Sequence, residues 1–357
     1  MRGVSGHSRT AVALLLCGLI AQGLFFFSAC ARAAGEGSGS SIEPYLVRAR
    51  QFADHLELNA AQLEAHDPPI AGKKKLAELL DLYLLLLRRE SRESARSTIL
   101  ARIDSLTLQV RTPGYQDLSH YSPKEFDANA LSYLRVYVLL DRVHRFTPQD
   151  RAQLEGVKDL LDASIERRGS WQREMFAKYY RQLGLELPAN LVDAEGSDPS
   201  AQSVQGPDAD SLATAREATV VARRIPFNQF NLQRAYSLTH EVFVAFDYGQ
   251  NKEQKRFDAD ELQYLRSVLI PLQQLTVRKK SLDLLAEVLS CRAYLGFTED
   301  PSYQEAFALI LESQNENGSW GDYEQHRAVY GDTLEVEGYL HTTLVCVQAL
   351  VDVAERS

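Results

Sequence analysis

The repeated helical spacing of apolar residues constrains the fold of this chain more than any other feature. Leucine-rich segments alternate with short breaks such as Thr112-Pro113-Gly114 and Phe146-Thr147-Pro148, and no strand pattern competes with them. Apolar residues three and four positions apart share one face of an α-helix, and Pro fits the first position of a new helix. The sequence therefore predicts an all-α chain of helix hairpins joined by short loops.

Antiparallel helix pairs in this number favour an α/α toroid, or an open α-solenoid, over a four-helix bundle. Residues 187–216 are rich in Pro, Gly, Ser and Asp without apolar periodicity, so we expect a linker of low order between an N-terminal helical half at 44–186 and a C-terminal half at 217–357. The predicted helices are 44–64, 73–89, 91–110, 127–144, 148–167, 227–246, 258–274, 278–295, 303–313 and 334–354.

Residues 1–30 have the layout of an export signal, followed by a flexible segment at 31–43. Arg2 and Arg9 precede a mostly apolar run, and no acidic residue occurs among them. Cleavage before Cys30 would give a lipoprotein, cleavage after Ala33 an ordinary secreted protein, and an intact signal a membrane anchor. All three alternatives place the protein outside the cytoplasm, as a periplasmic or membrane-anchored lipoprotein or a secreted protein. We expect membrane contact only through such an anchor.

Charge and short motifs exclude several classes of function. Lys and Arg number 39 against 48 Asp and Glu, a net charge of −9, and no basic block offers a nucleic-acid footprint. The sequence contains no phosphate-binding Walker loop, dinucleotide fingerprint, nucleophile elbow or H-E-x-x-H zinc motif. Cys291 and Cys346 are interpreted as small buried apolar residues, although a disulfide would suit an oxidising compartment. We therefore expect no nucleic-acid partner.

One motif gives a resemblance to a known superfamily. An apolar helix end leads into Gln314, then Gly318 and Trp320, in the pattern Q-x-x-x-G-x-W. This pattern resembles the QW repeat of the terpenoid cyclases and protein prenyltransferases, whose members fold as α/α toroids. The motif is structural in that superfamily, so the resemblance implies that Gln314 and Trp320 fasten helices together rather than catalyse a reaction.

His341 is a second point of resemblance. The segment around Tyr339 and His341 resembles the helix of protein prenyltransferase β subunits in which a His binds zinc, and the resemblance makes His341 a candidate ligand. The neighbouring Asp and Cys ligands of that family have no clear counterpart. Asp283, Glu287 and Cys291 recur one helical turn apart, and we interpret them as a solvated acid and a core thiol on one broad helix face.

His240 and Asp247 form the third candidate group. They lie two helical turns apart, so on a continuous helix both would occupy one face. They could bind a metal with His341, zinc or another divalent ion, or act as a base and its orienting acid beside Tyr248. Gly249 is expected to end this helix. The pattern T-H-x-x-F with D-Y-G, the QW-like turn and H-T-T also resembles an uncharacterised bacterial α/α-toroid family over residues 227–354.

Other polar residues have weaker support from spacing. Asp258 with Glu261 is similar to an acid motif of terpene cyclases, but we interpret the pair as a helix N-cap and capping box. The remaining candidates for the walls of a cavity are His120, Tyr121, Asp127, Tyr236, His326 and Asp332.

Two functions from different classes follow from these observations. The first is an exported enzyme whose toroid cavity holds a metal or a His/Asp acid–base site, acting on a small molecule or a saccharide. The second is a non-enzymatic binding or scaffold protein of the cell envelope, in which the His side chains are only hydrogen-bonded. Loss of a bound metal on substitution of His240 and His341 would distinguish the metalloenzyme from the scaffold protein.

Overall fold

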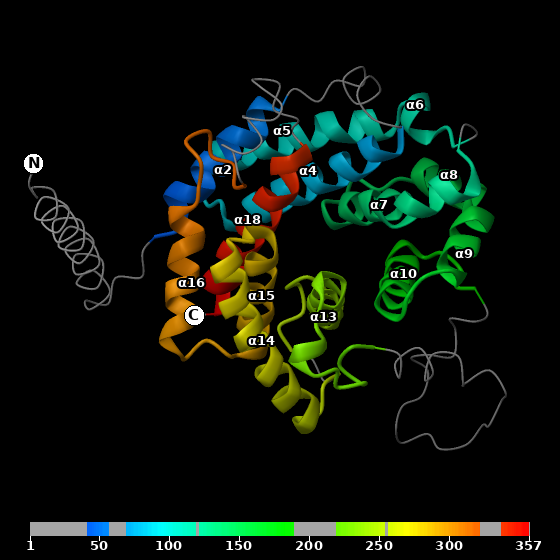
Figure 1. Ribbon diagram of the computed structural model, residues 1–357. Helices are drawn as coiled ribbons and strands as arrows, with labels where there is room; N and C mark the ends of the chain where they lie inside the picture. Colours follow the sequence, from blue (N-terminus) through cyan, green and yellow to red (C-terminus); the bar gives the residue numbers. More distant parts are fainter. Residues whose placement is uncertain are drawn as a thin grey trace, which may run out of the picture. The chain divides into compact units, whose positions relative to one another are not determined.

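The computed structural model describes residues 41–56, 69–118, 121–188, 219–253, 256–321 and 337–356. The chain divides into two units, Met1–Glu43 and Pro44–Ser357, and the site described below belongs to the second. Within the described ranges every regular element is helical and no strand is present, so the all-α prediction is confirmed. The elements shown in Figure 1 are α2 (Glu43–His55), α4 (Pro69–Arg89), α5 (Glu93–Val110), α6 (Pro113–Gln116), α7 (Pro123–Arg142), α8 (Pro148–Gly156), α9 (Lys158–Glu166), α10 (Ser170–Leu183), η1 (Phe227–Gln229), α13 (Leu232–Ala245), α14 (Ala259–Lys279), α15 (Leu282–Leu295), α16 (Pro301–Glu312) and α18 (Glu337–Arg356).

Polar side chains define where several helices begin. Ser122, Thr147 and Asp258 cap α7, α8 and α14, and each forms a full capping box with a carboxylate three residues later. The cap side chain accepts a hydrogen bond from a backbone N–H that the first helical turn leaves unpaired. The interpretation of Asp258 and Glu261 as a capping box is therefore confirmed.

The observed helices differ from the predicted ones at several points, among them the unpredicted short helix α6 and the end of α14, which runs to Lys279. The predicted helix at 148–167 is two helices, because the backbone turns at Val157 between α8 and α9. Helix α10 is absent from the predicted set although it follows Gly169 directly. The predicted helix at 227–246 begins as the short 3₁₀ helix η1, and α13 starts only after Asn231, whose side chain accepts a hydrogen bond from the Arg234 N–H at 2.9 Å.

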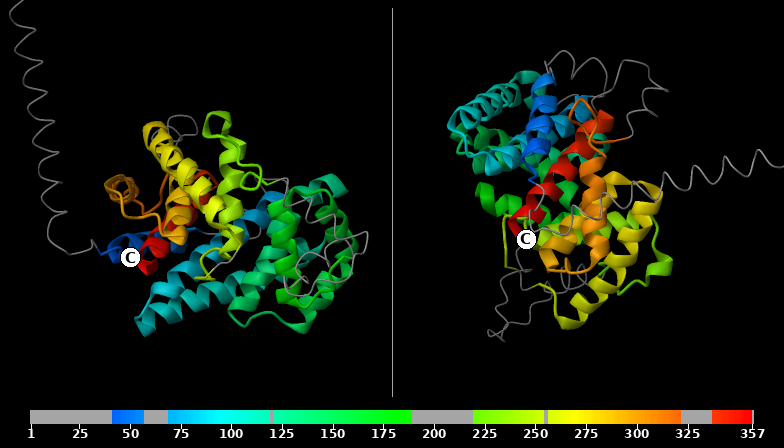
Figure 2. Two further views of the ribbon diagram at one scale, coloured as in Figure 1. Left: turned by 90° about the horizontal axis from the view of Figure 1, so that it is seen from below. Right: turned by 90° about the vertical axis from the view of Figure 1, so that its left-hand side faces the viewer.

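Six helices contact one another in a closed circuit. In order around it, α4 packs on α7, α7 on α10, α10 on α13, α13 on α15, α15 on α18 and α18 on α4. Further helices pack on this circuit, with α5 on α4, α9 on α7 and α10, and α14 and α16 on α15. Figure 2 shows these elements from two further directions, with α18 beside α15. The circuit joins helices from both sides of the predicted linker, which lies outside the described residues from position 189 on.

The QW-like turn fastens α16 to α18. Trp320 is completely buried, its indole N–H donates to the Ile310 carbonyl at 2.7 Å, and its backbone N–H donates to the Thr343 hydroxyl at 3.0 Å. A buried indole whose N–H is satisfied combines a large apolar contact with a fixed orientation.

The same turn also fastens α2. The Gln314 side chain donates to the carbonyls of Tyr45 on α2, at 2.9 Å, and of Gly318, at 3.0 Å. Gly318 has a φ of 89°, and a Cβ at this position would overlap the Arg48 carbonyl. The predicted role of Gln314 and Trp320 in joining helices is therefore confirmed by their contacts.

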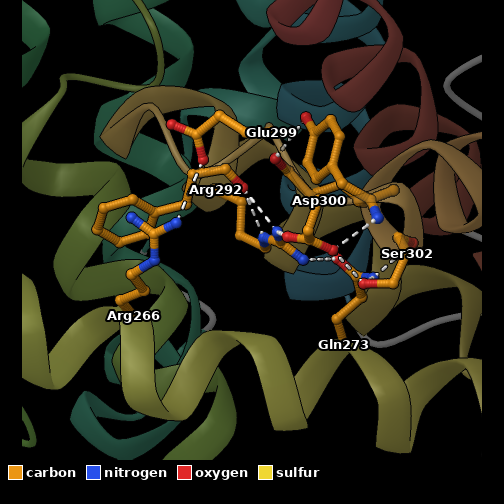
Figure 3. Close-up of polar contacts among 9 residues, drawn as sticks. Arg266, Gln273, Arg292, Glu299, Asp300 and Ser302 are labelled. Carbon is orange, nitrogen blue, oxygen red and sulfur yellow. Dashed lines mark hydrogen bonds and ion pairs between the residues drawn. The ribbon is translucent and has the colours of Figure 1, made fainter.

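Arg292 joins α14, α15 and the start of α16. Its guanidinium is fully buried and donates to the Phe297 carbonyl from Nε at 2.9 Å and from a terminal nitrogen at 2.7 Å. It also pairs with the Gln273 side chain and with the Asp300 carboxylate (Figure 3). Arg266 and Glu299 form a separate ion pair nearby, at 3.3 Å, that is exposed to solvent (Figure 3).

The two cysteines of the described part of the chain do not form a disulfide. Cys291 and Cys346 are both buried and free, as the first of the two interpretations expects. None of the helices within the described ranges combines the length and the apolar character that a membrane crossing needs.

Candidate functional site

Charged and aromatic side chains gather on the six helices of the circuit, and each helix supplies at least one. This placement is unusual because charged side chains are rare inside a protein unless they are paired. The group is Glu78 and Asp81 on α4, Arg135 on α7, Trp171 on α10, His240 on α13, Glu287 on α15 and His341 on α18.

His341 and Glu78 form an ion pair between α18 and α4. The imidazole Nδ1 lies 2.8 Å from a Glu78 carboxylate oxygen. The His341 side chain is 38% exposed whereas that of Glu78 is 10% exposed, so the carboxylate lies deeper than the ring it holds. Among the described residues this imidazole has no other hydrogen-bond partner.

The two members of the pair shift each other's pKa. Burial alone would lower the pKa of His341, but the hydrogen bond and charge of Glu78 outweigh it and raise that pKa. Burial would raise the pKa of Glu78, but the hydrogen bond and charge of His341, with the nearby Lys74 and Arg135, lower it. The pair is thus an imidazolium and a carboxylate over a wider pH range than either group alone would be charged.

Arg135 brings a second cation to α4. Its guanidinium pairs with Asp81, which follows Glu78 by about one helical turn on the same helix. The guanidinium also lies 5.0 Å from the centre of the Tyr248 ring. Each carboxylate on this face of α4 therefore has a cationic partner from another helix of the circuit.

Glu287 links the two predicted histidines electrostatically. Its side chain is buried, with 2% of the residue exposed, and accepts a hydrogen bond from the Thr239 hydroxyl at 2.6 Å. Burial raises the pKa of this carboxyl, Asp283 adds to the rise, and the charges of His240 and His341 oppose it. The interpretation of one acid on this helix face as solvated does not hold for Glu287, because α13 packs over that face.

His240 is held by its own helix and by an aromatic ring. Its Nδ1 lies 2.7 Å from the Tyr236 carbonyl, and its ring centre lies 4.5 Å from that of Trp171 on α10. Tyr236 pairs through its hydroxyl with Asp283 on α15. His240 is therefore fixed in orientation at the junction of α10, α13 and α15.

Asp247 does not share a helix face with His240, contrary to the prediction. Helix α13 ends at Ala245, and Asp247, Tyr248 and Gly249 follow with φ values of 47°, 51° and 81°. A left-handed conformation costs a residue other than Gly about 1–3 kcal/mol, so contacts with the surrounding structure must hold it. Asp247 lies 3.2 Å from Arg142 of α7, which is one such contact.

Gly249 explains why the chain turns at this point. A Cβ on Gly249 would lie 2.7 Å from an Asp352 carboxylate oxygen and 3.1 Å from the Tyr294 hydroxyl. These two residues are hydrogen-bonded at 2.5 Å, and the Phe246 ring stacks on Tyr294 at 5.1 Å. The turn at Gly249 thus packs against the buried Asp352–Tyr294 pair, and the Tyr248 ring lies beside Arg135.

The three predicted metal ligands have different partners. His240 contacts Tyr236, Asp247 contacts Arg142, and His341 contacts Glu78. In the part of the chain that the structure describes, no three or more His, Cys, Asp or Glu side chains are grouped so that they could hold a metal ion. The described residues do not fit the predicted three-ligand site, and zinc or another divalent ion stays a prediction from the sequence.

The other predicted wall residues lie elsewhere or outside the described ranges. Tyr121 lies near Lys73, a lysine with 2% of its surface exposed whose pKa burial lowers to about 8. Asp127 forms an ion pair with Arg167 at 2.6 Å. The predicted His120, His326 and Asp332 lie outside the described residues.

The sequence prediction missed Glu78, Asp81 and Arg135 although a signal was present. The two acids interrupt the leucine-rich run of α4, and Arg135 interrupts apolar sequence in α7. A charged residue within an otherwise apolar helix is a candidate for a buried, paired group.

Comparisons with known proteins add a family but no activity. A family model described as "Domain of unknown function (DUF6895)" matches residues 46–351. No curated protein and no solved structure matches the chain. The resemblance to terpenoid cyclases and protein prenyltransferases stays a prediction from motifs.

Proposed function

The chain belongs to the DUF6895 family, and we propose that it is an acid–base enzyme for a small, hydroxyl-rich molecule, with His341 as the group that transfers a proton. The observation that carries the proposal is the His341–Glu78 pair, in which a half-exposed imidazole is held at 2.8 Å by a nearly buried carboxylate. A base whose second nitrogen is oriented by a carboxylate is a recurring arrangement in general acid–base catalysis.

Two carboxyl groups near His341 support an assignment of roles. The pKa of Glu78 is lowered whereas that of Glu287 is raised, mainly by burial. Carboxyl groups whose pKa values are moved apart by their surroundings are typical of acid–base sites. Glu78 would stay ionised. Above the pKa of His341, the neutral imidazole would accept the proton of a substrate hydroxyl at Nε2, and Glu78 would stabilise the imidazolium that forms.

The side chains around this pair favour a saccharide or similar polyol as substrate. Trp171 and Tyr236 are partly exposed aromatic residues beside His240, and aromatic rings pack against the apolar faces of sugar rings. Arg135 and Asp81 supply donors and acceptors suited to hydroxyl groups. Sites for small molecules commonly combine a small number of polar groups with an aromatic and apolar lining.

The proposal includes an α/α toroid and a location outside the cytoplasm. The closed circuit of six helices, with further helices packed on it, supports the toroid. The layout of residues 1–30, with Arg2, Arg9 and Cys30, supports export. Mass spectrometry of the protein from a bacterial host tests the export proposal, since a mature chain that begins at Cys30 with a lipid or just after Ala33 is expected. A C30A variant would lose the lipid.

The enzyme proposal is tested by incubating the protein with a panel of glycosides, oligosaccharides and sugar acids and measuring their turnover by NMR. We expect H341N and E78Q to lower the rate by about 100-fold or more, which is the usual loss for a missing acid–base group. H144N is the matched control, because His144 is exposed and has a φ of 57° that Asn adopts readily. Equal rates in H341N and the unmodified protein would contradict the proposal. Saturable binding without turnover would favour the binding or scaffold protein instead.

A further inference from the structure

A pocket of about 500 Å³ lies at the end of α2, and neither His341 nor Glu78 lines it. Its described walls come from three parts of the chain, namely the end of α2, the turn after α16 and the beginning of α18. Pockets for small molecules generally have volumes of about 300–1,000 Å³, so this one has the size of a ligand site. Tyr339 points to this pocket whereas His341, two positions later on the same helix, contacts α4.

The walls of the pocket are held in place by hydrogen bonds. Gln314 joins the turn to the Tyr45 carbonyl of α2, and Trp320 joins it to Thr343 of α18. Asn317, which lines the pocket, accepts hydrogen bonds from the backbone N–H of Ser319 at 3.1 Å and from its hydroxyl at 2.7 Å. A site whose walls are already ordered binds a ligand at a lower entropic cost.

The chemistry of the lining is aromatic and acidic. Phe52 and Tyr339, exposed by only 8% and 2%, provide aromatic surface, and Leu56 adds an aliphatic group. The described residues that line the pocket include the carboxylate of Glu316 and the imidazole of His55, whose Nδ1 lies 2.6 Å from the Gln51 carbonyl, but no Lys or Arg. Aromatic rings attract a cation through their faces, and a carboxylate pairs with an ammonium group.

We propose that this pocket binds a small organic amine, in which an ammonium group pairs with Glu316 and an apolar or aromatic body packs against Phe52 and Tyr339. Glu316 is the one carboxylate among the described lining residues, and it would repel an anion of the same size, so the pocket is expected to discriminate by charge. This site is independent of the acid–base pair proposed above, because the two share no residue.

Three probes of nearly equal size test the charge preference, namely 2-phenylethylamine, 2-phenylethanol and phenylacetate. Their binding to the full chain is followed by saturation-transfer NMR. We expect the amine to bind about tenfold more tightly than the alcohol, the difference that one charge-assisted hydrogen bond makes, and phenylacetate to bind least. Equal binding of amine and phenylacetate, or no saturable binding of the amine, would overturn the proposal.

Variants locate the binding to this pocket. E316Q should weaken binding of the amine about tenfold and leave binding of the alcohol unchanged, because the substitution removes only the charge. E312Q is the matched control, since Glu312 is exposed at the end of α16 and does not line the pocket. Q51W, which places a large side chain at the pocket mouth, should abolish binding of all three probes while circular dichroism stays unchanged. An amine that binds E316Q or Q51W as well as the unmodified protein contradicts the proposal.

The H341N variant separates this site from the proposed function. It should bind 2-phenylethylamine as the unmodified protein does, whatever its effect on turnover. Loss of amine binding in H341N would place the amine at the acid–base pair and overturn the assignment of this pocket.

Discussion

Replacing Arg292 by Met should destabilise the protein severely. Arg292 is fully buried and donates two hydrogen bonds to the Phe297 carbonyl, and it also pairs with Gln273 and Asp300. Met fills a similar apolar volume but donates nothing. The substitution therefore isolates the hydrogen bonds that join α15 to α14 and to the start of α16 (Figure 3).

The expected loss follows from the groups left behind. The Phe297 carbonyl and the Gln273 side-chain oxygen would lose a buried donor, and a buried polar group without a partner costs about 1–3 kcal/mol. The side chain of Asp300 is 34% exposed, so water can replace part of the hydrogen bonding that Arg292 supplied to it. Breaking a buried pair by removing one partner typically costs about 3–5 kcal/mol, and we expect R292M to lower the free energy of unfolding by that amount.

Urea unfolding followed by circular dichroism measures this loss. R266M is the matched control, because Arg266 pairs with Glu299 while the two side chains are 52% and 67% exposed. An exposed ion pair contributes about 0–1 kcal/mol, so R266M should unfold almost as the unmodified protein does. A loss below about 1 kcal/mol in R292M, or equal losses in the two variants, would refute the reasoning.

Two further predictions concern stability. Burial raises the pKa of Glu241 from 4.5 to about 7 and that of Asp352 from 3.8 to about 6. Between these values each carboxyl group binds more protons in the folded state than in the unfolded state. The free energy of unfolding should therefore fall as the pH rises from about 4 to 7. Calorimetry at both ends of this range measures the trend, and a melting temperature that rises with pH would contradict it. G318A should lower the free energy of unfolding in urea by at least about 1–3 kcal/mol, because Ala is strained at a φ of 89° and its Cβ would overlap Arg48. An unchanged urea midpoint in G318A would show that the close approach of Gly318 to the Arg48 carbonyl of α2 is not needed for stability.

Local signals in the sequence were sufficient for most of the helices. Apolar spacing predicted α14 and α15, although α14 runs to Lys279, past the predicted start of the next helix at 278. Thr147 with Pro148 marked the start of α8 correctly. The QW-like motif also gave the right role to Gln314 and Trp320, because a turn that buries Trp requires little information from the remainder of the fold. The capping boxes and the contact of Trp320 with Ile310 depend on residues close together in the chain, whereas the contact of Gln314 with Tyr45 spans 269 positions.

The site depends on contacts that local patterns do not encode. Glu78 and His341 are 263 positions apart, and they meet only because α18 packs on α4. The end of α13 at Ala245 depends on the space that Asp352 leaves for Gly249, which no helical spacing reveals. Glu287 is buried by the neighbouring helix α13, so the local sequence did not show whether it or Asp283 was the solvated acid.

The central proposal is that Glu78 tunes His341 for proton transfer, and NMR titration of the His341 ring tests it most directly. The hydrogen bond and charge of Glu78 raise the pKa of His341 against the effect of burial, so the unmodified protein should titrate this ring above the ordinary value of 6.5. In E78Q burial and the charge of Lys74, which lower the pKa, outweigh the charge of Glu287, which raises it, and the pKa should fall below 6.5. A His341 pKa that is the same in E78Q and in the unmodified protein would contradict the proposed pair.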